Sequence, residues 1–146
     1  LRRFFREYRE LSLPQIESWY HSMVPDSRFE MFIISSASGE SLGVAGLTYI
    51  DFVNRHSDVH FYIGKDDLWI DDVIAVKIFP SLLDYGFHVL NLNKLWAEIY
   101  DIDKLKLNFF SSFGFSRDAL LREHYFVDGS YVSSCIYSLL RDEYNI

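Results

Sequence analysis

The chain has 146 residues and a mass of 17.2 kDa, which suits one domain over residues 1–146 rather than two independent cores. Hydrophobic residues make up 49% of it and aromatic residues 18%, enough for a packed interior, which excludes disorder as the main state. The 14 basic and 21 acidic side chains give a net charge of -7, which argues against nucleic acid as a partner.

The residue types also bear on compartment and metal chemistry. No apolar run approaches the roughly 18 residues that span a bilayer, so we expect no membrane association. Cys135 is the single cysteine, which favours the cytoplasm, and the histidines lack the spacing of metal ligands, so no metal is predicted. The first ten residues contain neither an initiator Met nor the apolar stretch of a signal peptide, so we interpret the chain as a fragment or a processed protein.

The N-terminal part of the chain predicts two helices. Apolar residues at helical spacing predict an amphipathic helix over residues 1–10. Its other face carries four arginines, Arg2, Arg3, Arg6 and Arg9. Ser12 as an N-cap, with Gln15 three residues later, begins a second helix that ends near Val24. Its apolar residues form one stripe, Ile16, Trp19, Tyr20 and Met23.

Three strands follow. Residues 29–35, 41–53 and 58–64 are rich in strand formers, and the turns at 36–40 and 54–57 join them into an antiparallel meander. Gly43 and Gly46 in the second strand indicate a bulge or the close approach of another backbone.

The C-terminal half alternates helices and strands. It predicts a helix over 72–90 kinked at Pro80, a strand over 94–100, a helix over 103–112, and a hairpin that turns at Asp128 and Gly129. The strand, helix and strand from residue 58 to residue 100 form a crossover unit. The fold class is therefore mixed α/β, with a parallel strand pair inside a mostly antiparallel sheet.

Four segments carry a resemblance to a known family. They are SLGVAGLTYID, DVHFYIGK, LLDYGFHVLNLNKLWAEIY and the terminal FFSSFGFSRDALLREHYFVDGSYVSSCIYSLLRDEY, of which FGF, LREHYF, DG and YSLL are the most specific parts. The chain resembles the GNAT superfamily of acyl-CoA N-acyltransferases, in the branch of ribosomal-protein N-terminal and amino-sugar-nucleotide N-acetyltransferases. The resemblance implies a twisted sheet whose parallel strands, 58–63 and 94–100, splay apart at the cofactor cleft. The first strand of the family has no counterpart here.

The resemblance also implies where acetyl-CoA binds as the acyl donor. Backbone N–H groups near Phe61, Tyr62 and Ile63 would hold the thioester carbonyl. The remaining cofactor positions are Gly64, Lys65, Asp72, Val73, Ile74, Ala75, Asp103 and Phe110. Relatives have small residues where this chain has Asp71 and Val73, so the loop is expected to take a wider course, with Lys65 reaching a phosphate. Relatives also have a Tyr where this chain has Phe110, which either slows thiolate protonation or is simply a core aromatic.

An amine acceptor must lose a proton before it attacks, so the site needs a base. Asp58 and His60 share one face of the third strand, so they either act on one cavity or form an exposed pair. Glu98 is the third candidate, because a carboxylate between the apolar neighbours of LWAEIY has a partner or a task.

The acceptor side is expected beyond the third strand. Its candidate residues are Tyr49, Asp51, Asn54, Arg55 and His124, for each of which a structural hydrogen-bonding role is an equal alternative. We predict direct acetyl transfer to a primary amine. The four arginines of residues 1–10 favour an amino-sugar nucleotide, whereas the overall negative charge suits a peptide N-terminus. The alternative function is a GNAT-fold binding or regulatory domain without catalysis, and a homodimer stays open.

Overall fold

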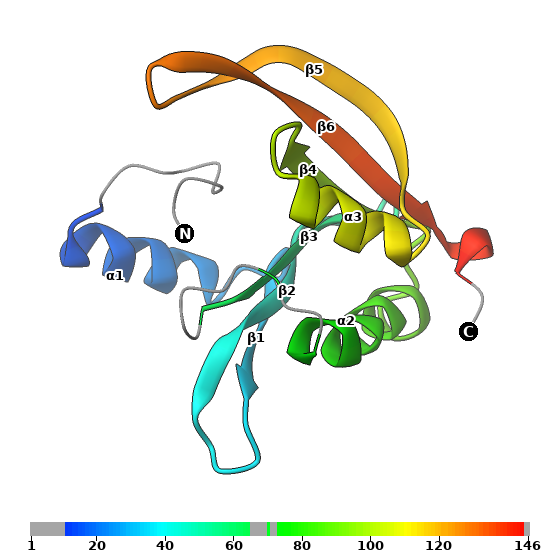
Figure 1. Ribbon diagram of the computed structural model, residues 1–146. Coiled ribbons are helices and arrows are strands. Elements are labelled where there is room, and N and C mark those ends of the chain that lie inside the picture. Colours follow the sequence, from blue (N-terminus) through cyan, green and yellow to red (C-terminus); the bar gives the residue numbers. More distant parts are fainter. Residues whose placement is uncertain (1–10, 65–69, 71–72, 145–146) are drawn as a thin grey trace.

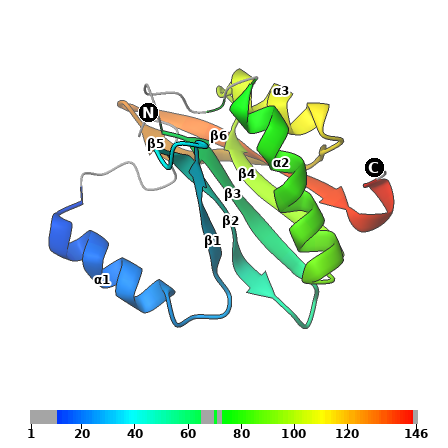
Figure 2. The same ribbon diagram turned by 90° about the horizontal axis from the view of Figure 1, so that it is seen from below.

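The computed structural model describes residues 11–64, 70 and 73–144, which form one mixed sheet with helices on both sides (Figure 1). The predicted helix over residues 1–10 with its arginines, Lys65, Asp71 and Asp72 lie outside the described residues. The sheet has six strands in the order β1-β2-β3-β4-β6-β5. Helices α2 and α3 lie together on one face, and α1 lies on the opposite side of the sheet (Figures 1 and 2).

Helix α1 (Leu13–Met23) begins at the predicted capping box. The backbone N–H and the hydroxyl of Ser12 both donate to Oε1 of Gln15, at 2.8 and 2.9 Å. The apolar stripe is largely exposed, because Met23 is buried whereas Trp19 and Tyr20 are each 53% exposed. Most of the stripe is therefore only partly covered, and Met23 alone among its four residues is buried.

Strands β1 (Glu30–Ser35), β2 (Ser41–Asp51) and β3 (His56–Ile63) form the predicted antiparallel meander. The two glycines of β2 mark close backbone approaches: a Cβ on Gly43 would lie 2.3 Å from the carbonyl oxygen of Tyr62, and one on Gly46 would lie 2.6 Å from that of Glu30. A register shift lies directly beside Gly43, because Ile34 pairs with Gly43 and Ser35 with Ser41, so both predicted alternatives hold at Gly43 and the close approach alone holds at Gly46.

Helix α2 (Ile74–Asp84) continues through Pro80 and passes into a π-helix, η3 (Tyr85–Val89). The predicted helix thus changes its hydrogen-bonding pattern at Tyr85, five residues after the proline. The buried side of α2 carries Ala75, Phe79, Leu82 and Leu83. These side chains join the main core, which lies between the sheet and helices α2 and α3.

Strand β4 (Lys94–Tyr100) completes the crossover and runs parallel to β3, as predicted. Only three residue pairs connect the two strands, His56 with Lys94, Ser57 with Leu95 and Asp58 with Trp96. Because β3 runs on to Ile63 and β4 to Tyr100, each strand extends beyond the last pair. We call the paired part the closed end of β3 and β4, and the unpaired part their open end.

The chain ends with helix α3 (Lys104–Ser112), strand β5 (Ser116–Val127), strand β6 (Ser130–Leu140) and a short 3-10 helix, η4 (Arg141–Glu143). The predicted hairpin turns at Asp128 and Gly129, both with positive φ, 51° and 81°. Strand β5 contains two register shifts, the second between Leu121 and Tyr125. This shift inserts extra residues opposite β6, which re-aims the side chains that follow it.

Candidate active site

The open end of β3 and β4 is where two helices begin. Helix α2 follows β3 and α3 follows β4, so both present their N-terminal ends on this side of the sheet (Figure 1). Helix N-termini carry partial positive charge and unpaired N–H groups, which attract anions such as phosphates. Asp103 caps α3 by accepting the N–H of Lys106 at 3.1 Å, and its side chain is buried.

Backbone donors of β3 line the opening. The N–H of Gly64 donates to the carbonyl oxygen of Leu42 on β2, at 2.8 Å. Because N–H groups alternate between the two edges of a strand, those of Phe61 and Ile63 face the side of β4. Their side chains are buried at 2% and 0% exposure, so they face the helix side of the sheet. The backbone edge of these two residues therefore faces the opening, and their contact with a thioester stays a prediction.

Side chains of β3 on the opposite face are polar. Asp58 is 1% exposed, which excludes the alternative of an exposed pair for this residue. His60 is half-buried and contacts Tyr62 edge to face, with ring centroids 5.7 Å apart. Burial raises the pKa of the Tyr62 phenol. The strand period thus places Asp58, His60 and Tyr62 on one face, as predicted for the first two.

Glu98 of β4 has the partners that the sequence predicts. The hydroxyl of Ser134 on β6 donates to its Oε1 at 2.5 Å, and the phenol of Tyr125 on β5 donates to Oε2 at 3.1 Å. Nε2 of His124 lies 3.8 Å from Oε1, within reach of an ion pair when the imidazole is protonated. The side chain of Glu98 is 10% exposed, so a largely buried carboxylate is held by two hydroxyl donors, with an imidazole nearby.

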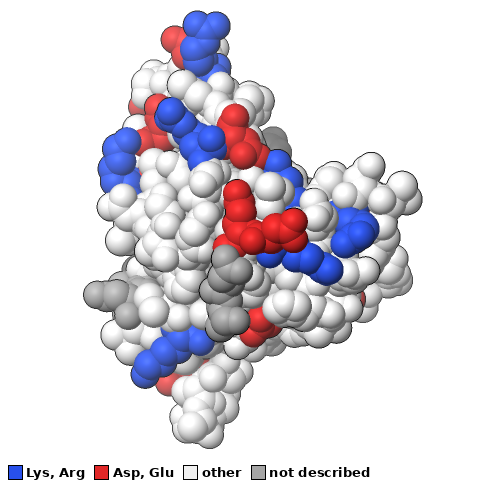
Figure 3. Space-filling model, turned by 90° about the vertical axis from the view of Figure 1, so that its right-hand side faces the viewer, with Lys and Arg blue, Asp and Glu red and all other residues white. Residues whose placement is uncertain are grey.

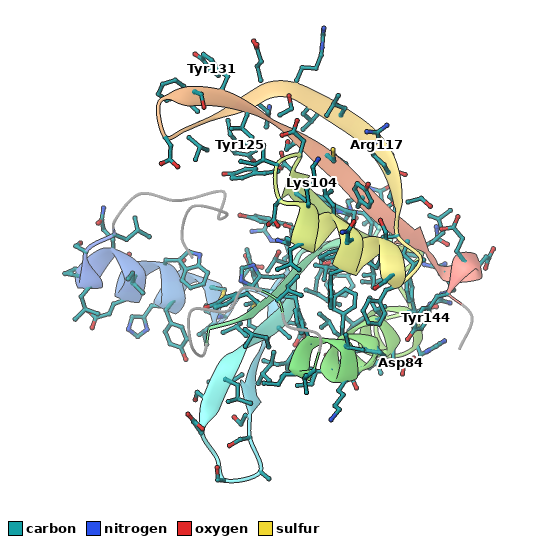
Figure 4. All side chains as sticks on the ribbon, viewed as in Figure 1. Asp84, Lys104, Arg117, Tyr125, Tyr131 and Tyr144 are labelled. Carbon is teal, nitrogen blue, oxygen red and sulfur yellow. The ribbon has the colours of Figure 1, made fainter. Side chains whose placement is uncertain are left out.

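Sequence reasoning missed Tyr125 and Ser134. Figure 4 shows Tyr125 beneath the β5–β6 hairpin and Tyr131 on its upper side. Tyr125 lies within the LREHYF segment, but nothing in that segment names its partner, because the contacts with Glu98 depend on the register of three strands and on the shift in β5. No sequence signal marks Ser134, whose place beside Glu98 follows from the register that pairs it with Tyr100.

The other cofactor positions divide between core and surface. Phe110 is fully buried among aromatic rings, with Phe79 and Phe115 at centroid distances of 5.3 and 4.9 Å, so it has the role of a core aromatic. At the start of α2, Val73 is 58% exposed, Ile74 is half-buried and Ala75 is buried. Val73 is thus the most accessible of the three at the helix N-terminus.

Four predicted acceptor residues lie at the closed end. Asp51 accepts the N–H groups of Val53 and Asn54 and the side-chain amide of Asn54, at 2.8 to 2.9 Å. The hydrogen bonds from Asn54 lower the pKa of Asp51. Arg55 donates from Nε to the carbonyl oxygen of Asn91 at 2.9 Å, and Tyr49 packs edge to face on Phe29. The contacts of Asp51, Asn54 and Arg55 stabilise the turn between β2 and β3, and Tyr49 packs on the residue before β1, whereas His124 lies beside Glu98.

On the face shown in Figure 3, basic and acidic side chains of the described residues are intermixed, so neither charge predominates there. Within the described residues no helix is long and apolar enough to cross a membrane. The same part of the chain holds no group of three or more His, Cys, Asp or Glu residues arranged for a metal ion.

Comparisons with known proteins agree with this geometry. The acetyltransferase (GNAT) domain family matches residues 1–136. The uncharacterised N-acetyltransferase p20 of Bacillus licheniformis is 29% identical over 112 residues, 77% of this chain and 62% of that protein. The spermidine N(1)-acetyltransferase of Escherichia coli K12 is 25% identical over 140 residues, 94% of this chain and 73% of that protein. The chain therefore spans less than two thirds of the Bacillus protein.

A solved structure shares the fold. The spermidine N-acetyltransferase of Vibrio cholerae in complex with CoA and spermine superposes with a TM-score of 0.85 and 21% identity, over 92% of this chain and 79% of that one. The likeness confirms the mixed α/β architecture with one parallel pair that the sequence predicts.

Proposed function

Because this chain belongs to the GNAT acetyltransferase family, we propose that it is an acetyl-CoA-dependent N-acetyltransferase acting directly on a primary amine. The observation that carries the proposal is the open end of β3 and β4, where backbone donors, two helix N-termini and a buried carboxylate border one gap. A pantetheine arm fits such a gap because it hydrogen-bonds strand backbone, and phosphates suit the helix ends.

The chemistry needs one new bond and one proton transfer. Acetyl-CoA supplies the thioester; the amine nitrogen bonds to its carbonyl carbon, the C–S bond breaks, and CoA leaves as a thiolate. N–H groups of Phe61 and Ile63 face the side where the carbonyl oxygen gains charge. The proton lost by the amine goes to a side-chain base. The thiolate takes a proton from solvent, because the pKa of a thiol is about 8.5.

We assign the base to Glu98 in preference to Asp58, and His60, which is half-buried and also lies beyond the last pair, is the competing candidate. Glu98 lies on β4 beyond the last pair with β3, whereas Asp58 belongs to that pair. Glu98 keeps 10% of its side chain exposed and Asp58 keeps 1% of its residue surface, so a substrate reaches Glu98 more readily. A base must come within hydrogen-bond distance of the amine, which makes access the deciding property.

The acceptor that we favour is a small cationic amine such as a polyamine. Two of the similar proteins named above are spermidine acetyltransferases, and the polar face of β3 and β4 carries two buried carboxylates, Asp58 and Glu98. An amino-sugar nucleotide, favoured by the arginines of residues 1–10, and a peptide N-terminus, as in ribosomal-protein acetyltransferases, are the competing acceptors. The case for the nucleotide rests on arginines outside the described part of the chain, and the case for the peptide rests on the net charge of -7.

Binding and turnover test the proposal in sequence. Acetyl-CoA at about 100 times its Kd should add about 2.7 kcal/mol to the free energy of unfolding, visible as a rise in Tm. Thiol release is then measured with spermidine, an amino-sugar nucleotide and a peptide with an unblocked N-terminus. No rise in Tm at millimolar acetyl-CoA would overturn the proposal. Binding without turnover on any of the three would favour the regulatory domain.

A further inference from the structure

Two hydroxyl groups hold the Glu98 carboxylate, one on each oxygen. Ser134 donates to Oε1 at 2.5 Å and Tyr125 donates to Oε2 at 3.1 Å. A carboxylate that accepts one bond on each oxygen from two different strands has its plane fixed, because rotation about the last side-chain torsion would break both bonds. The direction of its remaining lone pairs is then set by the sheet.

The two donors are themselves held in place. Ser134 is fully buried in β6, where its Cα partner on β4 is Tyr100. The ring of Tyr125 packs on that of Tyr100 with centroids 4.9 Å apart, inside a small apolar cluster with Val127 and Val132. Neither hydroxyl therefore depends on a mobile surface side chain.

The register shift of β5 is what brings the phenol to the carboxylate. Leu121 pairs with Ser134 and Tyr125 pairs with Val132, so four steps along β5 match two along β6. Glu123, inside the shift, has a positive φ of 50°, and its N–H donates to the hydroxyl of Ser133 at 3.1 Å. Such strained insertions recur next to active sites, where they re-aim a side chain.

We propose that Tyr125 and Ser134 are positioning residues that orient Glu98 to accept the proton of the acceptor amine. The inference rests on the proposed function and deepens it. A base whose oxygens are aimed before substrate arrives lowers the cost of reaching the reactive geometry, and an error of about 1 Å in such a geometry costs up to about 100-fold in rate. His124, which is half exposed, borders the same carboxylate but is not needed for its orientation.

A double-mutant cycle tests the proposal. Tyr125→Phe and Ser134→Ala each should lower kcat by about tenfold, while the KM for acetyl-CoA changes by less than about twofold. Glu98→Gln alone should lower kcat by about 100-fold. In the Glu98→Gln background, adding either substitution should change kcat by less than about twofold, because the group that they orient no longer accepts a proton. A role confined to stability would give the same factor in both backgrounds.

Matched controls come from the same hairpin. Tyr131→Phe removes a phenol from a residue that is 66% exposed on the outer side, and Ser116→Ala removes an exposed hydroxyl at the start of β5; both should leave kcat unchanged (Figure 4). Melting curves of all variants confirm folding. Two results would overturn this inference alone, provided that the wild type turns over. One is an unchanged kcat in Tyr125→Phe and Ser134→Ala, and the other is an equal loss of kcat in the wild-type and Glu98→Gln backgrounds. Absence of wild-type turnover on every amine would overturn the proposed function and this inference with it.

Discussion

The two ends of the β3–β4 pair are built by different forces. At the closed end, polar groups join the strands to the loop that precedes β4: Arg55 donates to Asn91, and the backbone N–H groups of Asn93 and Lys94 donate to the carbonyl oxygen of Arg55. Arg141 adds two bonds from its guanidinium, to the carbonyl oxygens of Leu92 and Phe87. Hydrogen bonds therefore define the point from which the strands diverge.

At the open end, aromatic packing replaces strand pairing. Phe61 of β3 contacts Phe79 of α2 and Phe109 of α3, with centroid distances of 5.2 and 6.0 Å. Phe79 also contacts Phe109 and Phe110 at 5.0 and 5.3 Å. The helices thus hold the diverging strands from one face, at the end where we propose that the cofactor binds. The closed end is thus held by hydrogen bonds, and the open end, where we propose that catalysis occurs, is supported by aromatic packing. Mutations at each end can test this difference.

The largest effect is expected at the aromatic core. Phe79 is fully buried and has ring contacts with five phenylalanines, so Phe79→Ala leaves a large cavity between α2, α3 and β3. We expect a loss of about 3–5 kcal/mol in the free energy of unfolding, measured by urea denaturation. Val76→Ala on the same helix, at a residue 43% exposed, is the control and should cost well under 1 kcal/mol. Equal costs for the two would contradict an aromatic support of the open end.

Arg141 tests the closed end. Arg141→Ala removes the donors to the carbonyl oxygens of Phe87, within η3, and Leu92, in the loop before β4. The expected cost is about 2–3 kcal/mol, because a charged donor is lost and acceptors are left with poorer partners. Arg141→Lys should recover part of this, since one ammonium lacks the fork of the guanidinium. The control is Arg122→Ala, at an exposed residue of β5. If this variant is destabilised as much as Arg141→Ala, the two hydrogen bonds of Arg141 do not explain the loss.

Which contacts at the two ends of the β3–β4 pair are predictable from the sequence depends on how far apart their residues lie in the chain. The capping box of Ser12 and Gln15 and the turn at Asp128 and Gly129 are local, and both were predictable because short-range backbone chemistry decides them. The parallel pair was predictable from the order of strand, helix and strand. The hydrogen bonds of Arg141 at the closed end were not predictable, because their acceptors lie about 50 positions earlier in the chain.

The site was predictable only in part for the same reason. The apolar neighbours of Glu98 indicated a partner, but the identity of Ser134 and Tyr125 depends on strand register and on a two-residue insertion in β5. The strand period put Asp58 and His60 on one face, yet it carries no information on whether that face is covered. The residues at the end of β2 were predicted to lie on the acceptor side, and the structure places their contacts near the closed end, so their contact with an acceptor stays a prediction.

A substitution at Phe110 tests whether this side chain belongs to the core or to the opening between β3 and β4. The resemblance raises the question of a missing phenol there, whereas the ring is fully buried beneath the open end. Phe110→Tyr should therefore cost about 1–2 kcal/mol, because a hydroxyl enters an apolar cluster, and should leave the rate of acetyl transfer no higher than in the wild type. Urea denaturation and steady-state kinetics measure the two effects. A faster enzyme of undiminished stability would place this side chain at the opening instead.

The smallest effect is an ion pair beside the closed end, between Lys94 of β4 and Asp118 of β5. The hydrogen bond from Lys94, together with that from Ser138 at 2.8 Å, lowers the pKa of Asp118 below its ordinary value of 3.8. A lowered carboxyl pKa stabilises the fold above the ordinary value, and this contribution is lost as the pH falls through the folded-state pKa. Both side chains are more than a third exposed, so Lys94→Gln should cost about 0.5 kcal/mol or less at pH 7 and nothing in strong acid. Denaturation of the wild type, Lys94→Gln and the control Lys77→Gln across the acid range measures this. A difference between wild type and Lys94→Gln that persists unchanged into strong acid would show that Lys94 acts through packing of its stem, and the closed end would then owe nothing to this charge.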